Sequence, residues 1–367
     1  MSSNSETPMY LSRDDSNLAE YERYAFRGWI GEKDFINENP KPTIIDLSTR
    51  AVTYEMSLYP YYEVEDATKI ASDLKYFSFR EVSKITLAKD KYIYSNSDDT
   101  EFDTPIILTS QYVLDVKPEY QSSLSGKITF PSKDSTGRTI TALGNLGESQ
   151  SLITHAFFLA DAKYELIGER AFANNSNLNL IYFSENMDSL KYIGANAFVN
   201  NSNLSQIINL PNSIEYIGAS SFFWCPAEIK ELPTSLNYIG KSGFLGCSNL
   251  TATILPHGIT YILPETFAYC SKLNIAHFGN STNGALSPID NNLTRIGYDS
   301  FSIGSNSTAP TDIYLHSSLK YLGHGCFNNY GSEILTIHDG TDILTQDSLS
   351  DYFGKNKKFT FLQEDNH

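Results

Sequence analysis

The chain lacks the segments that would place it in a membrane. Among its 367 residues, no apolar run approaches the roughly 18 residues of a membrane-spanning helix, and Met1 to Thr7 has neither the basic nor the apolar region of a secretory signal. Positive charge is also scarce, since 27 Lys and Arg face 43 Asp and Glu, for a formal net charge of −16. We therefore expect no nucleic-acid partner and no membrane insertion.

Motifs of catalysis are missing as well. The sequence contains no nucleophile elbow, no phosphate-binding glycine loop, no HExxH and no CxxC. Histidines do not pair at metal-ligand spacing, and the closest approach of a His to a Cys is His324-Gly325-Cys326, where the thiol precedes a predicted core phenylalanine. We expect no catalytic residues, no cofactor and no metal site, and hence a protein that is not an enzyme.

Cysteine is rare and regularly placed. The four cysteines are Cys225, Cys247, Cys270 and Cys326. The first three stand three residues after a repeated phenylalanine, where earlier repeats have Asn175 and Asn201. A position that accepts Asn or Cys is typical of a small inward slot, which favours buried free thiols over the alternatives of a disulfide or a metal ligand. Spacings of 22 and 23 residues match no zinc signature.

A repeat dominates the rest of the chain. Seven segments share a pattern such as Ile193-Gly194-x-x-Ala197-Phe198, with phenylalanines 26, 24, 22, 23, 34 and 26 residues apart. This period predicts a leucine-rich-repeat solenoid. One turn cannot bury its own apolar face, so neighbouring turns must stack about 4.8 Å apart. The ring ladder expected inside the stack is Phe172, Phe198, Phe222, Phe244, Phe267, Phe301 and Phe327.

Tyrosines form a second column, directly before the repeated Ile or Leu. Its members are Tyr192, Tyr216, Tyr238, Tyr261 and Tyr321. Because the flanking Leu190 and Ile193 should point inward, we expect these tyrosines to point outward as a partly exposed strip. Two interpretations stay open: an aromatic binding surface, or a ladder whose rings only stabilise one another. A second candidate surface is the outward face of the longer strands, with Tyr182, Ile254, His277 and Tyr314.

The repeat resembles the BspA-type leucine-rich repeats of bacterial and protist surface proteins. The resemblance rests on the pattern I-G-x-x-A-F-x-x-C/N-x-x-L, followed by a strand that ends in Leu-Pro, as in Leu210-Pro211. It covers about residues 128 to 362. It implies a right-handed solenoid with one parallel strand per turn, in about seven to eight turns, and a non-catalytic adhesin that binds proteins or cells.

The residues before the repeat predict a separate unit. We predict an N-terminal arm over residues 1–35 with a short helix from Leu18 to Ala25, and a small α+β or mostly-β docking domain over 36–124. Within that domain we expect a helix at 65–76 and strands at 43–47, 51–56, 82–93 and 106–116. The solenoid would then occupy 125–350 and a C-terminal cap 351–367, which makes the whole chain α+β or mostly β.

Two functions fit these features. The first is a non-enzymatic recognition protein, adhesin-like, whose solenoid binds a protein or glycan while the N-terminal domain anchors it. The alternative is a bacteriophage virion or appendage protein docked through its N-terminal arm and domain. The corresponding location is the cell surface or the virion.

Overall fold

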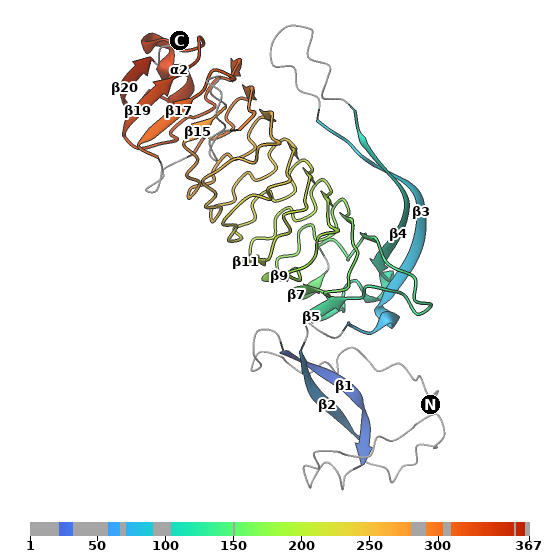
Figure 1. Cartoon of the computed structure of the whole chain (residues 1–367). Coiled ribbons are helices and arrows are strands. Elements are labelled where there is room, and N and C mark those ends of the chain that lie inside the picture. Colours follow the sequence, from blue (N-terminus) through green and yellow to red (C-terminus); the bar gives the residue numbers. More distant parts are fainter. Residues whose placement is uncertain are drawn as a thin grey trace.

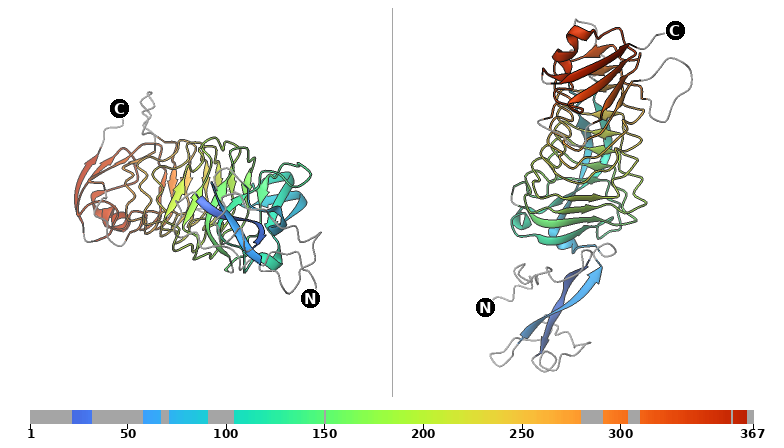
Figure 2. Two further views of the ribbon diagram at one scale, coloured as in Figure 1. Left: turned by 90° about the horizontal axis from the view of Figure 1, so that it is seen from below. Right: turned by 90° about the vertical axis from the view of Figure 1, so that its left-hand side faces the viewer.

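The computed structural model describes residues 22–31, 58–66, 71–90, 104–149, 151–279, 291–303, 310–355 and 357–363. Its main body is a mostly-β solenoid of about nine parallel turns (Figures 1 and 2), so the predicted fold class is confirmed. Each turn contributes backbone to two parallel ladders, and each ladder pairs a residue with its counterpart in the next turn. Stacking of equivalent residues explains why the chain repeats its apolar pattern.

The first ladder is built from two-residue strands, and we call its side of the solenoid the narrow face. The strands are β6 (Ala142–Leu143), β8 (Leu166–Ile167), β10 (Tyr192–Ile193), β12 (Tyr216–Ile217), β13 (Tyr238–Ile239), β14 (Tyr261–Ile262), β16 (Arg295–Ile296) and β18 (Tyr321–Leu322). The isoleucines or leucines that end these strands point inward and are buried.

The second ladder contains longer strands, and we call its side the strand face. They are β5 (Ser125–Phe130), β7 (Leu152–Phe158), β9 (Leu180–Tyr182), β11 (Gln206–Ile208), β15 (His277–Phe278), β17 (Asp312–Leu315), β19 (Ile334–Asp339) and β20 (Lys358–Gln363). Single bridges at Gln206–Glu228 and Ile229–Leu250 continue the ladder beyond β11.

The repeated phenylalanines form the spine of the core. All seven are buried, at 2% exposure or less. Consecutive rings from Phe172 to Phe327 stack with centroids 5.1 to 5.6 Å apart. Phe353 extends the spine by one ring, 5.0 Å from Phe327. Stacked rings add directional attraction to the burial of apolar area, so the spine couples each turn to the next.

The segment around each spine ring is a tight loop whose inward slots are polar or thiol-bearing. Asn201 accepts the backbone N–H of Asn175 through its side-chain oxygen at 2.9 Å. In later turns the same slot holds Cys247, whose thiol donates to the carbonyl of Phe222 at 3.1 Å, and Cys270, whose thiol donates to that of Phe244. All four cysteines are free and buried. Asn and Cys therefore serve one structural purpose, which is to satisfy backbone groups between turns.

Glycine after the inward isoleucine permits close approach of the turns. A Cβ on Gly218 would lie 2.5 Å from the backbone nitrogen of Ala195, and one on Gly240 would lie 2.3 Å from that of Ala219. Because these contacts are to backbone, no side chain could move away to make room.

A long antiparallel hairpin precedes the repeats and belongs to the same sheet. It pairs β3 (Phe77–Leu87) with β4 (Ile106–Val116), and β4 pairs in parallel with β6 at the start of the narrow face. The sheet order is β13-β12-β10-β8-β6-β4-β3. Residues 77–87 and 106–116 were expected in a separate domain that ends at residue 124. In the structure β4 pairs with β6 through Val113 and Leu114, and β3 pairs with β4, so both strands belong to the sheet of the narrow face.

The N-terminal residues differ from expectation in secondary structure. β1 (Glu22–Gly31) and β2 (Leu58–Asp66) form a two-stranded antiparallel sheet. The predicted helix at Leu18–Ala25 is wrong from Glu22 onward, because the β-favouring run Tyr24 to Ile30 pairs with β2. The helix expected at 65–76 is also wrong where it is described: β2 includes Glu65 and Asp66, and Leu74–Tyr76 is a single 3-10 turn. The strands expected at 43–47 and 51–56 lie outside the described residues.

The C-terminal residues continue the stack. A 3-10 turn (Gln346–Ser348) leads into the short helix α2 (Leu349–Phe353), which supplies the carbonyl of Tyr352 to the N–H of Phe327. β20 then pairs along its whole length with β19. The predicted cap at 351–367 is thus, in its described part, a further turn of the solenoid.

Candidate functional site

The tyrosine column lies on the narrow face, but most of it is covered. Tyr216, Tyr238 and Tyr261 are 2%, 1% and 8% exposed, whereas Tyr192 and Tyr321 are half-buried. The rings of Tyr216 and Tyr238 stack at 4.8 Å, and Tyr261 meets Tyr238 edge-on at 6.2 Å. The prediction of an exposed strip therefore needs correction at the three central tyrosines.

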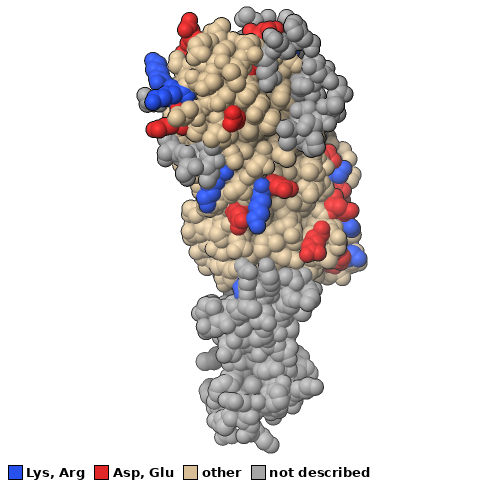
Figure 3. Space-filling view, turned by 60° about the vertical axis from the view of Figure 1, so that its left-hand side comes forward, with Lys and Arg blue, Asp and Glu red and all other residues tan. Residues whose placement is uncertain are grey.

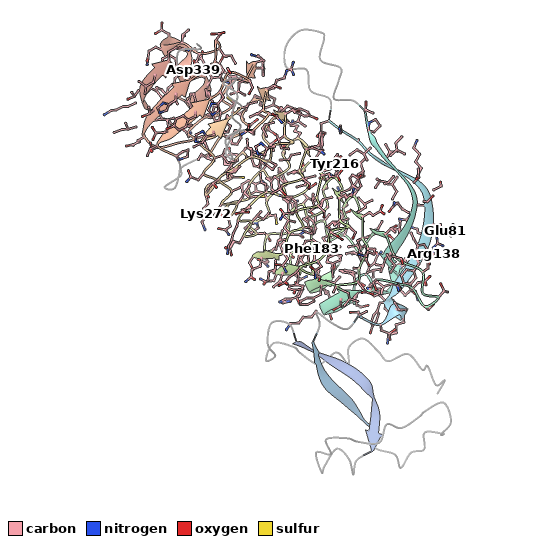
Figure 4. All side chains as sticks on the ribbon, in the orientation of Figure 1. Glu81, Arg138, Phe183, Tyr216, Lys272 and Asp339 are labelled. Atoms are coloured by element: carbon pink, nitrogen blue, oxygen red, sulfur yellow. The ribbon has the colours of Figure 1, made fainter. Side chains whose placement is uncertain are left out.

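The cover comes from the β3–β4 hairpin, which runs along the narrow face. Leu87 and Leu108 from the hairpin pack in one apolar cluster with Tyr216, Tyr238 and Tyr261. Figure 4 places Tyr216 on the side of the solenoid that faces the hairpin. The hairpin therefore covers these three rings, which contact it instead of a partner.

Hydrogen bonds fasten the hairpin to two of these tyrosines. The hydroxyl of Tyr216 donates to the carbonyl of Ala88 at 2.5 Å. The hydroxyl of Tyr238 accepts the backbone N–H of Asp90 at 2.7 Å and donates to its carboxylate at 3.1 Å. That carboxylate also accepts the backbone N–H of Lys241 at 2.7 Å. Burial raises the pKa of Tyr216 and of Tyr238 well above the ordinary value, so both hydroxyls stay protonated.

The base of the hairpin is held by a charged contact with the first turn. The Arg138 guanidinium lies 3.9 Å from the ring centroid of Tyr112 and forms an ion pair with Glu81 (Figure 4). Tyr112 in turn donates its hydroxyl to Asp134 at 2.7 Å, and this bond holds the pKa of Asp134 below its usual range. The hairpin is thus attached at its base and along its length.

The strand face carries the open surface. Figures 1 and 2 show its strands on the opposite side of the solenoid from the hairpin. In register across β15, β17, β19 and β20 stand His277, Tyr314, His338 and Leu362. The Tyr314 ring lies 4.4 Å from that of His277 and 4.2 Å from that of His338, both nearly parallel. We call His277, Tyr314 and His338 the aromatic row.

A shallow hollow adjoins the aromatic row. Its volume is about 490 Å³, and its lining is Thr253, Ile254, Asn274, Ala276, Pro310, Thr311, Asp312 and Tyr314. Ile254 is 45% exposed there. Figure 3 looks onto this side of the molecule, where most of the described surface is neither basic nor acidic. Apolar and neutral polar groups around a hollow, with one charged group such as Asp312, are typical of a recognition surface.

Polar contacts fix the histidines of the row. Nδ1 of His277 lies 3.4 Å from Nε2 of His316, and Nε2 of His338 lies 3.3 Å from a carboxylate oxygen of Asp312. The hydroxyl of Thr311 and then His338 lower the pKa of Asp312, which keeps it charged at the edge of the hollow. The row thus presents rings in fixed orientations, with the carboxylate of Asp312 beside them.

Neither face assembles catalytic machinery within the described ranges. Burial raises the pKa of Cys225 to about 12 and that of Cys326 well above its ordinary value, so both remain thiols. No group of three metal-ligating side chains gathers among the described residues, and no helix in them is long and apolar enough to cross a bilayer.

Comparison with known families gives the same picture. A profile of the BspA type leucine rich repeat region matches six copies, over residues 149–207, 165–287 and 286–362. The matches together span more than half of the chain. The chain belongs to this family. The resemblance drawn from the repeat pattern is thereby confirmed, and leucine-rich repeats of this kind are surfaces for protein interaction.

Solved structures with similar solenoids include three bacterial proteins. A leucine rich repeat protein of T. pallidum is 15% identical, with 71% of this chain and 89% of that chain covered and a TM-score of 0.39. A leucine rich cell surface protein of Faecalibacterium prausnitzii A2-165 is 16% identical, with 69% and 72% covered and a TM-score of 0.44. A leucine-rich repeat protein of Bacteroides ovatus is 18% identical, with 74% and 66% covered and a TM-score of 0.36. Curated proteins give no match.

The sequence favoured the tyrosine column over the strand face as a candidate binding surface because the tyrosines were expected to be partly exposed, and three of them are buried. Ile254, His277 and Tyr314 were noticed only as a mixed outward face, whereas the structure brings His277 and Tyr314 into one stacked row beside the hollow. The stacking of His338 was not anticipated. Its signal was present, because His277, Tyr314 and His338 occupy equivalent strand positions in successive turns.

Proposed function

We propose that this protein is a non-enzymatic recognition protein, adhesin-like, which binds its partner through the strand face. The observation that carries the proposal is the aromatic row beside an open, nearly uncharged hollow, on the side away from the hairpin. Aromatic side chains contribute large contact area with few rotatable bonds, and for that reason they dominate binding energy at interfaces.

The covered narrow face supports this assignment. The hairpin buries the three central tyrosines and fastens two of them by hydrogen bonds, so contact between a partner and their rings would require the hairpin to detach. The family is one of surface proteins, which favours a partner met outside the cell. The N-terminal segment, with its β1–β2 pair, is the proposed anchor. The family match does not favour the bacteriophage alternative.

A pair of variants tests the strand face. Ile254→Ser with Tyr314→Ser removes apolar area from the hollow, and Ile107→Ser is the matched control because Ile107 is 51% exposed on the hairpin. We expect the double variant to lose at least tenfold in affinity for any protein that the wild-type chain captures from an extracellular extract, with the control unchanged. Equal capture by wild type and double variant would refute the assignment.

A further inference from the structure

A column of left-handed backbone positions runs along the loop side of the solenoid, two residues after six of the seven spine phenylalanines. This loop side is distinct from the narrow face and the strand face. The φ angles are 55° at Asn174, 58° at Asn200, 52° at Trp224, 78° at Gly246, 59° at Tyr269 and 60° at Asn329. Asn and Gly are the residues that tolerate this conformation, whereas a bulky aromatic residue there is an outlier. Trp224 and Tyr269 therefore occupy positions that local backbone preference disfavours.

The rings of these two residues, Trp224 and Tyr269, stack on each other. Their ring centroids lie 6.1 Å apart at an interplanar angle of 24°, although a whole turn separates them. Gly246 makes this possible from the intervening turn, because a Cβ there would lie 2.7 Å from the Trp224 ring. Backbone hydrogen bonds link the loops that carry the two rings. The N–H of Trp224 donates to the carbonyl of Leu245, and the N–H of Gly246 donates to the carbonyl of Ala268. We call Trp224 and Tyr269 the ring pair.

The ring pair is presented to solvent. Trp224 is 50% and Tyr269 is 51% exposed, and in the described part of the chain no other Phe, Tyr or Trp is exposed to this degree. Had the rings served only to fill the stack, they would be buried like the spine. Strained backbone that presents large apolar side chains to water points to a binding role.

Side-chain amides lie in the turns around the ring pair, together with the ammonium of Lys272. Asn200, in the turn before Trp224, donates its side-chain amide to that of Asn174 at 2.9 Å. Asn249 lies five residues after the spine residue Phe244. Its side chain donates a hydrogen bond to the carbonyl of Pro226 and accepts one from the ammonium of Lys272, each at 2.7 Å. Figure 4 shows Lys272 at the edge of the solenoid away from the hairpin. Amides offer both donors and acceptors to an uncharged polyol.

We propose that the ring pair is a carbohydrate-binding platform for neutral oligosaccharides. The C–H faces of a pyranose carry partial positive charge, which complements the negative face of an aromatic ring, while the sugar hydroxyls can bond to the neighbouring amides. A protein partner fits less well, because about 800 Å² per side is normal for a stable interface and only two exposed rings are present. The acidic chain disfavours nucleic acid.

The variants Trp224→Asn and Tyr269→Asn test this site without threatening the fold, since Asn is the residue of this column in three other turns. The probe is a printed array of neutral glycans together with heparin-type acidic glycans, incubated with the full chain. We expect wild type to bind at least one neutral glycan and the double variant to bind it at least tenfold less. The melting temperature of the double variant should be equal or higher.

Independent controls separate this site from the strand face. The Ile254→Ser, Tyr314→Ser variant should keep glycan binding, and the ring-pair variant should keep any protein captured through the strand face. With Trp29 replaced by Phe, Trp224 is the sole tryptophan of the chain, and its fluorescence should change on titration with the neutral tetrasaccharide that the array selects. The proposal is overturned if no neutral glycan binds, if only acidic glycans bind, or if the double variant binds equally.

Discussion

The attachment of the hairpin by Tyr238 gives the sharpest quantitative prediction. Tyr238→Phe keeps the ring in the column and removes only the hydroxyl. That hydroxyl accepts one backbone N–H from Asp90 and donates to its carboxylate. A neutral hydrogen bond contributes about 1 kcal/mol and one to a charged group about 1.5–3 kcal/mol, but Asp90 is half-buried, so we expect a loss of about 2 kcal/mol.

The loss should be local. The spine phenylalanines do not contact Asp90, so the melting temperature of the solenoid should hardly change, whereas opening of the hairpin end should increase. A loss of about 2 kcal/mol corresponds to roughly a 30-fold larger opening constant. Hydrogen–deuterium exchange followed by mass spectrometry on a peptide covering residues 84–90 would measure this as a 30-fold fall in protection.

The matched control is Tyr314→Phe, on the opposite face of the solenoid, which should leave exchange at residues 84–90 unchanged. Unchanged exchange in Tyr238→Phe would refute the claim that this hydroxyl fastens the hairpin. A large fall in melting temperature would show that the hairpin and the spine unfold as one unit.

Four further predictions follow from the core and its ionisable groups. Phe222→Ala should cost about 3–5 kcal/mol in urea denaturation because the ring is buried between two stacked neighbours, and the half-exposed Phe223→Ala should cost clearly less. Gly218→Ala should cost on the order of 1–3 kcal/mol, and a cost near zero would contradict the close backbone approach. The native chain should show no reaction with a thiol reagent, and four thiols should react after denaturation; rapid native labelling would contradict their burial. Burial, with a contribution from Lys127, lowers the pKa of His155 from 6.5 to about 4. Between these two pH values the unfolded state binds more protons than the folded state, so the free energy of unfolding falls as the pH falls through that window. Between pH 7 and 4.5 the wild type should lose about 1–2 kcal/mol more stability than His155→Gln, and parallel pH profiles of the two proteins would exclude the effect.

Much of the solenoid could be predicted because its determinants are local and repeated. Each Phe, its Gly and its Asn or Cys slot recur within one turn, so stacking in register follows from the period alone. The ring ladder from Phe172 to Phe327 is the clearest example, and all of its members are buried as the pattern requires.

The burial of the tyrosine column could not be predicted in the same way. The groups that cover Tyr216 and Tyr238 come from residues 128 and 148 positions earlier in the chain. No repeat pattern reveals that β3 and β4 fold back along the narrow face, because they are not part of the repeat. β1 shows the same limit, since pairing with β2 overrides a helical reading of residues 22–25.

The ring pair was missed for a different reason. Trp224 and Tyr269 break the Asn and Gly preference of their column, and a search for shared features passes over members that differ. In a repeat protein the positions that depart from the consensus at a demanding backbone conformation are candidates for function.

The most direct test of the whole account is hydroxyl-radical footprinting of the intact chain with residue-level mass spectrometry. The structure predicts slow oxidation of Tyr216 and Tyr238 beneath the hairpin and fast oxidation of Trp224 and Tyr269 on the loop side. Fast oxidation of Tyr216 and Tyr238 together with protection of Trp224 would contradict the assignment of covered and open faces.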